Sequence, residues 1–242
     1  IFILVIAALF FGYYQVRQMD AREVQTAVDQ SENKATAVFA GGCFWCTEAD
    51  FEKLDGVIEA VSGYTGGNVE DPSYEEVSRG GTGHVEAVKV IYDPDQIHYR
   101  QLLNYFWRHI DPTDAGGQFV DRGAQYRSVI FYKNEQQRRE AEASRKRLVE
   151  SGRFEEPIAT ELLPLGTFYE AEEYHQDYYK AHSIRYKFYR FNSGRDQFLE
   201  KVWGDDVSST GPFAEQEMMD KSKEEAKPKE ATMKHNGHDK YR

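Results

Sequence analysis

The chain has 242 residues, a net charge of −11, 40% hydrophobic residues and 14% aromatic residues. This length and apolar content suffice for one sizeable core. The acidic balance argues against a nucleic-acid-binding surface, and two cysteines are too few for a disulfide-stabilised scaffold.

The chain begins with an unbroken apolar run. Residues 1–11 are apolar and continue into Gly12-Tyr13-Tyr14. A run of this length suits the hydrophobic region of a signal peptide, and tyrosines after it are typical of the border of a membrane anchor. We therefore predict an apolar signal or membrane anchor at 1–14 and a polar spacer at 15–33. Both alternatives predict a membrane-anchored or exported protein, periplasmic or extracytoplasmic.

The segment 34–205 alternates between strand and helix patterns and is predicted to form one domain. Runs of β-branched and aromatic residues predict strands at 35–40, 57–64, 84–92, 127–133 and 158–163. Helical spacing predicts helices at 44–54, 72–79, 99–110 and 135–150, and a partly helical segment at 171–190. Asp71 and Pro72 are predicted to begin the second helix. The order predicts an α+β fold, a split β-α-β (ferredoxin-like) mixed sheet with helices on one face, plus extended Gly/Tyr-rich loops.

The composition changes after residue 205. Segment 206–242 is rich in Glu and Lys and contains almost no large apolar residue. Such a segment buries too little apolar surface to fold, so we predict a disordered charged tail or linker.

Both cysteines lie in one motif, Gly41-Gly42-Cys43-Phe44-Trp45-Cys46, between a predicted strand and a predicted helix. The glycines suit a sharp strand-to-helix turn, which places Cys43 at a helix N-terminus, where unpaired N–H groups favour a thiolate. Three interpretations compete: a structural pair, half of a zinc site, and a redox-active nucleophile with a partner thiol. The redox interpretation is favoured because a short helix cannot bury both aromatic residues between the cysteines.

Four further residues are candidates for chemistry. Glu86 lies inside the most apolar predicted strand, where a carboxylate is costly unless it is paired, protonated or lining a cavity. A raised pKa would let Glu86 donate a proton near neutral pH; the alternative is an outward-facing Glu. Tyr74, Asp121 and Tyr126 each lie in or beside a Gly-rich segment, typical of loops around a site. The alternative for them is packed tyrosines and a capping Asp.

Several motifs occur together in the order of a known enzyme family. They are Gly42–Cys46, Gly63–Gly67, Gly83–Val88, Asp121–Ser128 and Glu173–Tyr178. Across roughly Ala35 to Asp205 the chain thus resembles the A-type peptide methionine sulfoxide reductases. The resemblance implies that the chain reduces methionine S-sulfoxide, in proteins or as the free amino acid, to methionine.

The resemblance also implies a role for each matching residue. Cys43 matches the nucleophile, and Glu86 matches the acid at the sulfoxide oxygen. The other matches are Phe44 and Trp45 for the S-methyl pocket, Tyr74 and Tyr126 for hydroxyls at the oxygen, Asp121 for a polar pocket residue, and Glu48 and His175 for residues near the site. The resemblance implies no bound cofactor, no metal, and a thioredoxin or exported thioredoxin-like dithiol as reductant.

The chain departs from the family in two respects. Many members carry Gly at the position of Cys46 and use cysteines near the C-terminus; this chain has no cysteine after Cys46, which is therefore the only internal resolving candidate. In some relatives a B-type reductase domain follows a linker like 227–242, so a fused domain after residue 242 is an alternative. Two rival functions are a general thiol–disulfide exchange protein using Cys43 and Cys46, and a membrane-tethered binding module.

Overall fold

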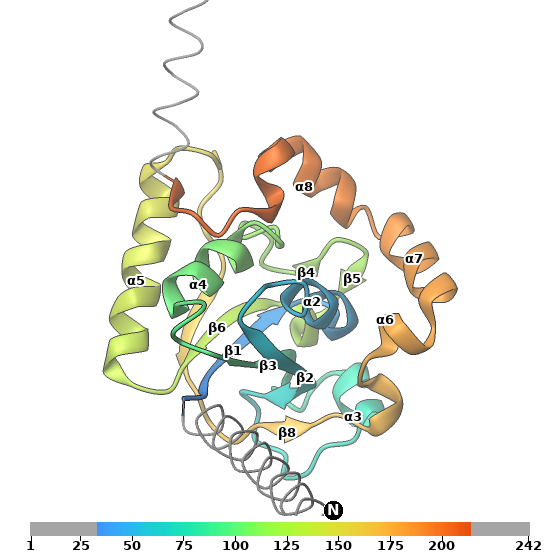
Figure 1. Ribbon diagram of the computed structural model, residues 1–242. Coiled ribbons are helices and arrows are strands. Elements are labelled where there is room, and N and C mark those ends of the chain that lie inside the picture. Colours follow the sequence, from blue (N-terminus) through green and yellow to red (C-terminus); the bar gives the residue numbers. More distant parts are fainter. Residues whose placement is uncertain (1–32, 214–242) are drawn as a thin grey trace, which may run out of the picture.

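The computed structural model describes residues 33–213 (Figure 1). The predicted signal or anchor at 1–14, nearly all of the predicted spacer at 15–33, and the predicted tail from residue 214 onwards lie outside the described residues. Within residues 33–213, no helix has both the length and the apolar character that a membrane crossing requires.

Six strands form a mixed sheet in the order β7-β6-β1-β3-β2-β8. The β6–β7 pair is parallel and the other neighbours are antiparallel. The order β6-β1-β3-β2 is that of a split β-α-β sheet, which confirms the predicted α+β fold. The strands are β1 (Ala35–Gly41), β2 (Val57–Thr65), β3 (Val85–Tyr92), β6 (Ser128–Tyr132), β7 (Glu161–Pro164) and β8 (Tyr169–Glu170), with β4 (Gly117–Gln118) and β5 (Asp121–Arg122) in a separate ribbon.

Helices cover one face of this sheet. The α-helices are α2 (Phe44–Phe51), α3 (Tyr74–Arg79), α4 (Tyr99–Trp107), α5 (Glu135–Glu150), α6 (Tyr178–Ala181), α7 (Ser183–Asn192) and α8 (Arg195–Trp203). The short 3-10 helices of the described part of the chain are η1 (Ala124–Tyr126), η2 (Glu173–His175) and η3 (Gly204–Ser208). In Figure 1, α6, α7 and α8 follow one another around the outside of α2.

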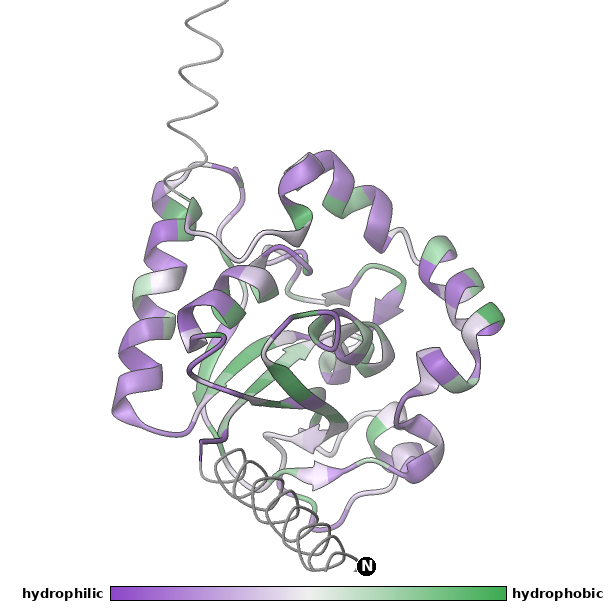
Figure 2. Cartoon of the chain, in the orientation of Figure 1, coloured by the Kyte–Doolittle hydropathy of each residue, from purple (hydrophilic) through white to green (hydrophobic). Residues whose placement is uncertain are grey.

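Both faces of the central strands β1 and β3 are buried, and both strands are mostly apolar (Figure 2). Alternation along β1 places Phe39 in the larger core with α2, α4 and α5. It places Val38 in a second core on the opposite face. That face is covered by Leu163, Leu165 and Phe168, which come from the β7 segment and the loop after it.

The helix α3 begins later than the sequence predicts. Its N-cap is Ser73, whose hydroxyl accepts the Glu76 N–H while the Glu76 carboxylate accepts the Ser73 N–H. This reciprocal capping box satisfies two N–H groups at once. Asp71 instead has a φ of 46°, outside the extended conformation of an N-cap residue. The predicted start at Asp71 and Pro72 is therefore wrong.

The folded domain also extends beyond the predicted boundary at 205. Phe213 is fully buried, with its ring centroid 5.6 Å from that of Trp203. The guanidinium of Arg108 lies 4.7 Å from the Phe213 ring centroid. The predicted start of the tail at residue 206 is too early. Phe213 is buried in the core and anchors the segment 206–213, although the composition of 206–242 is polar on average.

Candidate active site

The turn between β1 and α2 places Cys43 directly before the helix. Gly42 has a φ of 86°, and a Cβ there would lie 2.5 Å from the Cβ of buried Gln118. Only glycine fits both the conformation and the space. Cys43 is the N-cap of α2, and its carbonyl accepts the N–H of Cys46 at 3.1 Å. The two cysteines therefore belong to one helical turn.

Glu86 lies beneath this turn. Val88 and Val90 belong to the core under α2. They follow Glu86 by two and four residues in β3, so strand alternation places Glu86 on the same face of the sheet. Its carboxyl group is buried and accepts the Phe44 N–H at 2.9 Å. Burial raises the pKa of Glu86 to about 8, although the Phe44 hydrogen bond lowers it. The acid is therefore protonated at neutral pH, which the sequence predicted for a buried carboxyl group.

Cys43 and Cys46 are both buried free thiols that share a hydrogen bond. Burial, above all, raises the pKa of Cys43 well above its usual value. The pKa of Cys46 is lowered to about 7 by the Cys43 hydrogen bond and by the positive charges of Arg195 and Arg190. The pair thus loses one proton near neutral pH, and that charge opposes loss of the second. Burial therefore acts against the thiolate that the sequence predicts at Cys43.

Three further predicted residues face Glu86. Burial and then the charge of Glu86 raise the pKa of Tyr74, at the start of α3, to about 12. The same two causes raise the pKa of Tyr126, in η1. Asp121, in β5, raises the pKa of Glu86 in turn and accepts a hydrogen bond from the Tyr189 hydroxyl. The structure thus gathers Tyr74, Tyr126 and Asp121 around the acid from separate segments.

Phe44 and Trp45 differ in their exposure. Phe44 is 1% exposed, and its ring centroid lies 5.9 Å from that of Tyr64. Trp45 is only partly buried and stacks on Tyr178, with ring centroids 3.7 Å apart and an interplanar angle of 4°. The first turn of α2 therefore buries one aromatic ring and leaves the other beside the solvent, as the sequence predicted.

His175 supports Trp45 and has a defined tautomer. The Trp45 indole N–H donates to His175 Nδ1 at 3.1 Å. An indole nitrogen only donates, so Nδ1 accepts and the ring proton is on Nε2. Burial lowers the pKa of His175, which keeps the ring neutral. Its ring lies 5.0 Å from that of Phe44 and 4.4 Å from that of Tyr74, between centroids.

Glu48 lies on α2 but joins other elements. Its carboxyl group accepts the Ser62 hydroxyl of β2 and the Asp177 N–H at the start of α6. Burial raises its pKa to about 7. The carboxylates of Glu48, Glu52 and Asp177 lie within 4.8 Å of one another. Lys180 forms ion pairs with both Glu52 and Asp177 at 2.7 Å, so a protein ammonium group already balances this cluster.

No residue of α7 or α8 was among the site residues predicted from the sequence, although two arginines of these helices act on Cys46. Arg190 forms a buried ion pair with Asp50 at 2.8 Å. Arg195 donates to the Gly41 carbonyl at 2.8 Å, one residue before the glycine of the turn. Segment 178–195 contains no Asp or Glu in a chain of net charge −11. This absence of acidic residues is the sequence pattern that could have indicated the basic residues Arg190 and Arg195 near the site.

Comparisons with known proteins agree with this geometry. Residues 35–207 match the family model described as peptide methionine sulfoxide reductase. Peptide methionine sulfoxide reductase MsrA of Bacillus licheniformis is 55% identical over 174 residues, which cover 72% of this chain and 96% of that protein. MsrA/MsrB of Vibrio cholerae is 51% identical over 176 residues, 73% of this chain but 47% of that protein. This chain therefore matches about half of the Vibrio protein.

Two solved structures share the fold. Mxr1 of Saccharomyces cerevisiae in its reduced form has a TM-score of 0.59 and 32% identity, covering 63% of this chain and 87% of that one. Methionine sulfoxide reductase A of Corynebacterium diphtheriae has a TM-score of 0.57 and 33% identity, and the match covers 63% of this chain and 76% of that one. The family, the fold and the order of the motifs agree, and this chain belongs to the A-type peptide methionine sulfoxide reductases, enzymes that reduce methionine sulfoxide.

Proposed function

We propose that this enzyme reduces the S epimer of methionine sulfoxide, in proteins and as the free amino acid. In this proposal Cys43 is the nucleophile, Cys46 resolves the intermediate, and a thioredoxin-like dithiol restores both thiols. The observation that carries the proposal is the buried Glu86 carboxyl group. Its pKa is raised to about 8, so it is protonated at neutral pH, and it accepts a hydrogen bond from the backbone N–H of Phe44, the residue after Cys43.

In the first step Glu86 and two hydroxyl groups make the sulfur electrophilic. A sulfoxide sulfur accepts a nucleophile once its oxygen is protonated or strongly hydrogen-bonded. Glu86 supplies the proton, and the hydroxyls of Tyr74 and Tyr126 hydrogen-bond the same oxygen. Each such donor is worth about 3–4 kcal/mol of transition-state stabilisation.

The cysteine pair supplies the nucleophile. Cys43 passes its proton to the Cys46 thiolate through their shared hydrogen bond, and the Cys43 thiolate attacks the substrate sulfur. The oxygen is transferred to Cys43, which becomes a sulfenic acid, and methionine leaves. Cys46 then attacks the Cys43 sulfur, water leaves, and a disulfide forms.

The external dithiol completes the cycle by thiol–disulfide exchange. Its two thiols become a disulfide, while Cys43 and Cys46 return to the reduced state. The number and place of the cysteines support a Cys43–Cys46 disulfide, since the 242-residue sequence contains no other cysteine.

Stereospecific turnover tests the proposal. With dithiothreitol as reductant, we expect the S epimer of methionine sulfoxide to be consumed and the R epimer to persist. Glu86→Ala should abolish this reduction and leave exchange between the cysteine pair and a small disulfide intact. Equal loss of both activities, or sulfoxide reduction by Glu86→Ala, would contradict the role assigned to Glu86. Disulfide exchange by a wild-type protein that reduces no sulfoxide would favour the general exchange protein.

We also propose that the apolar segment 1–14 exports or anchors the enzyme. The support is the length of the run and the tyrosines at its end. An oxidising compartment would convert the pair to a disulfide, so reduction there requires a dedicated dithiol donor. Cell fractionation of the full-length chain tests the location: recovery of all protein in the cytosolic fraction would contradict it.

We further propose that a B-type reductase domain follows residue 242. The support is the linker-like composition of 227–242 and the similarity to a relative named MsrA/MsrB. Intact-protein mass measured on the product expressed from its native gene tests this, and a mass of 28.0 kDa or below would contradict it.

A further inference from the structure

A two-residue loop connects β4 to β5 at one edge of the site. Gln118 pairs with Asp121 in this ribbon, so the loop residues are Phe119 and Val120. Phe119 has a φ of 56°, in the left-handed region. The first position of such a loop takes a positive φ in both favoured hairpin turns, and Gly, Asn or Asp normally stands there because a bulky side chain is strained in this conformation. A phenylalanine at this position therefore needs contacts that hold it.

The Phe119 ring has such contacts with two residues of α8. The guanidinium of Arg195 lies 4.6 Å from the ring centroid, within the range of a cation–π contact. The Phe198 ring lies 5.6 Å away, between centroids, at an interplanar angle of 67°, which is a favourable edge-to-face arrangement. Val120, by contrast, is 53% exposed. The loop is therefore held to α8 through the side chain of its first residue.

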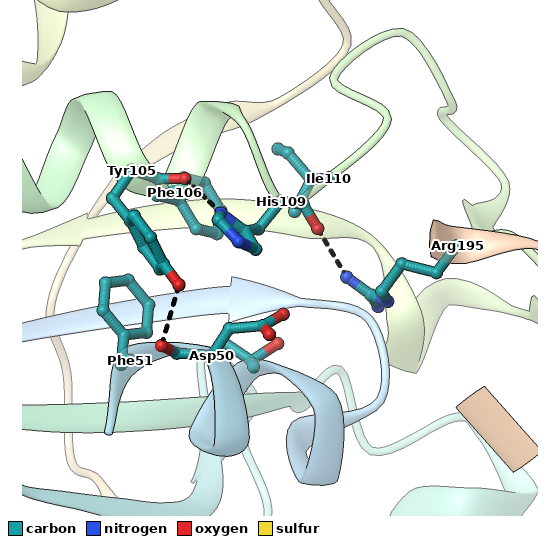
Figure 3. Close-up of a pocket in the computed structure, with 8 residues that line it drawn as sticks. Asp50, Phe51, Tyr105, Phe106, His109, Ile110 and Arg195 are labelled. Carbon is teal, nitrogen blue, oxygen red and sulfur yellow. Dashed lines mark hydrogen bonds between the residues drawn. The ribbon is translucent and has the colours of Figure 1, made fainter. Parts of the chain in front are cut away.

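Arg195 is itself firmly held. It is 1% exposed, and its guanidinium donates to the His109 carbonyl at 2.6 Å and to the Gly41 carbonyl at 2.8 Å. Figure 3 shows the first of these bonds beside a cavity of about 10 Å³. A cavity of this size holds at most one water molecule, so the guanidinium has little room to shift. The Phe119 ring thus packs on a group that is bonded to the turn leading to Cys43.

The first strand of the ribbon is also fixed. Gln118 is fully buried, and its side-chain amide donates to the Asp111 carbonyl at 2.7 Å and accepts the Asp111 N–H at 2.8 Å. A Cβ at Gly42 would lie 2.5 Å from the Gln118 Cβ, so β4 packs directly against the Cys43 turn. Asp121 follows Gln118 after the two loop residues. The place of Asp121 relative to the Cys43 turn therefore depends on the conformation of this loop.

We propose that Phe119 is a positioning residue of the site: its ring, held by two residues of α8, keeps the loop in the strained conformation that presents the Asp121 carboxylate to the substrate pocket. The Tyr189 hydroxyl donates to the same carboxylate from α7. Contacts to α7 and α8 thus fix this edge of the pocket. The inference rests on the proposed place of Asp121 in the pocket.

Glycine substitutions at the two loop positions test the role of the ring. Phe119→Gly removes the ring and relieves the strain, because glycine adopts a positive φ readily. These effects on stability oppose each other, so we expect a Tm within about 4 °C of the wild type. The kcat/KM for a methionine sulfoxide peptide should nevertheless fall about tenfold or more, mainly through KM, because a binding group is misplaced. Val120→Gly is the matched control: it adds similar backbone freedom without removing a packed ring, and its kcat/KM should stay within about twofold of the wild type.

A double-mutant cycle with Asp121→Ala shows whether the ring acts through Asp121. If it does, adding Phe119→Gly to Asp121→Ala should lower kcat/KM less than about twofold further, because the group that the ring positions is already absent. Should Phe119→Gly fail to fold, Phe119→Leu, which keeps apolar bulk without an aromatic face, takes its place in the cycle under the same criteria.

The cycle separates the possible failures. Losses that multiply in the double variant, or wild-type kinetics of the folded Phe119 variant, would overturn the positioning role and leave the place of Asp121 in the pocket intact. Wild-type kinetics of Asp121→Ala would refute that place, and the role of Phe119 with it. A wild-type protein that reduces no methionine sulfoxide would instead refute the proposed function.

Discussion

The Phe44 backbone N–H donates a hydrogen bond to the Glu86 carboxyl group, with 2.9 Å between the two atoms. This bond joins the helix that begins after Cys43 to the strand that carries the acid. Because the donor belongs to the backbone, the position of the acid does not depend on the side chain at residue 44. The proposed nucleophile, Cys43, and the proposed proton donor, Glu86, are therefore held at a fixed relative position by β3 and the first turn of α2.

We expect Glu86→Gln to slow the single-turnover reduction of methionine sulfoxide about 100- to 1000-fold, because the amide cannot transfer a proton. In the wild type, the Glu86 pKa is raised to about 8. The proton donor is present below that pH, so the rate should fall as the pH rises through about 8. Stopped-flow measurement of methionine formation checks both effects, and an unchanged alkaline limb in Glu86→Gln would contradict the assignment.

The same raised pKa has a consequence for stability. A carboxyl group with a higher pKa in the folded state than in the unfolded state makes the folded state bind more protons. Its contribution is therefore complete below the unfolded pKa of about 4 and is lost as the pH rises towards 8. Denaturant titrations should show a smaller loss of stability over this interval for Glu86→Gln than for the wild type.

We expect Cys46→Ser to release one equivalent of methionine per enzyme molecule and then to stall with a thioredoxin-like dithiol. The serine hydroxyl cannot form a disulfide with the Cys43 sulfenic acid. Quantifying methionine in the first turnover and at steady state checks this. Sustained turnover of the variant at the wild-type rate would show that resolution does not require Cys46.

Trp45→Phe should raise the KM for a sulfoxide peptide about two- to tenfold, because it removes one hydrogen bond and keeps an aromatic ring. The bond lost is the one to His175 Nδ1. Trp203→Phe is the matched control, since the Trp203 indole N–H is buried and has no hydrogen-bond partner in the described structure. Equal KM values for the two variants would argue against a role for the Trp45–His175 bond.

Phe213→Ala should lower the free energy of unfolding by about 3 kcal/mol and the Tm by about 6–12 °C. Phe213 is fully buried against Trp203, so the substitution leaves a cavity. Phe188→Ala is the control, because Phe188 is 73% exposed. Thermal unfolding checks both variants; a Tm for Phe213→Ala equal to that of the control would place the end of the stable domain before residue 213.

Local sequence patterns were sufficient for the central elements. The apolar, β-branched runs of β1 and β3 and the helical spacing of α4 and α5 are each set by residues close together in the chain, and the structure has these elements close to where the patterns predict them. The capping box of α3 was also readable, as Ser73 and Glu76 have the required spacing, but the Asp71-Pro72 pair competed with it.

The sequence by itself determined the family and the order of the main strands and helices, and it singled out Cys43 and Glu86 as candidates, because these depend on residue type and spacing along the chain. Only the tertiary structure decided that two positive charges act on Cys46, since Arg190 and Arg195 come from α7 and α8, far away in sequence. It also decided that Phe213 belongs to the domain. Burial and long-range charge act through space, and no local pattern records which distant side chains will meet.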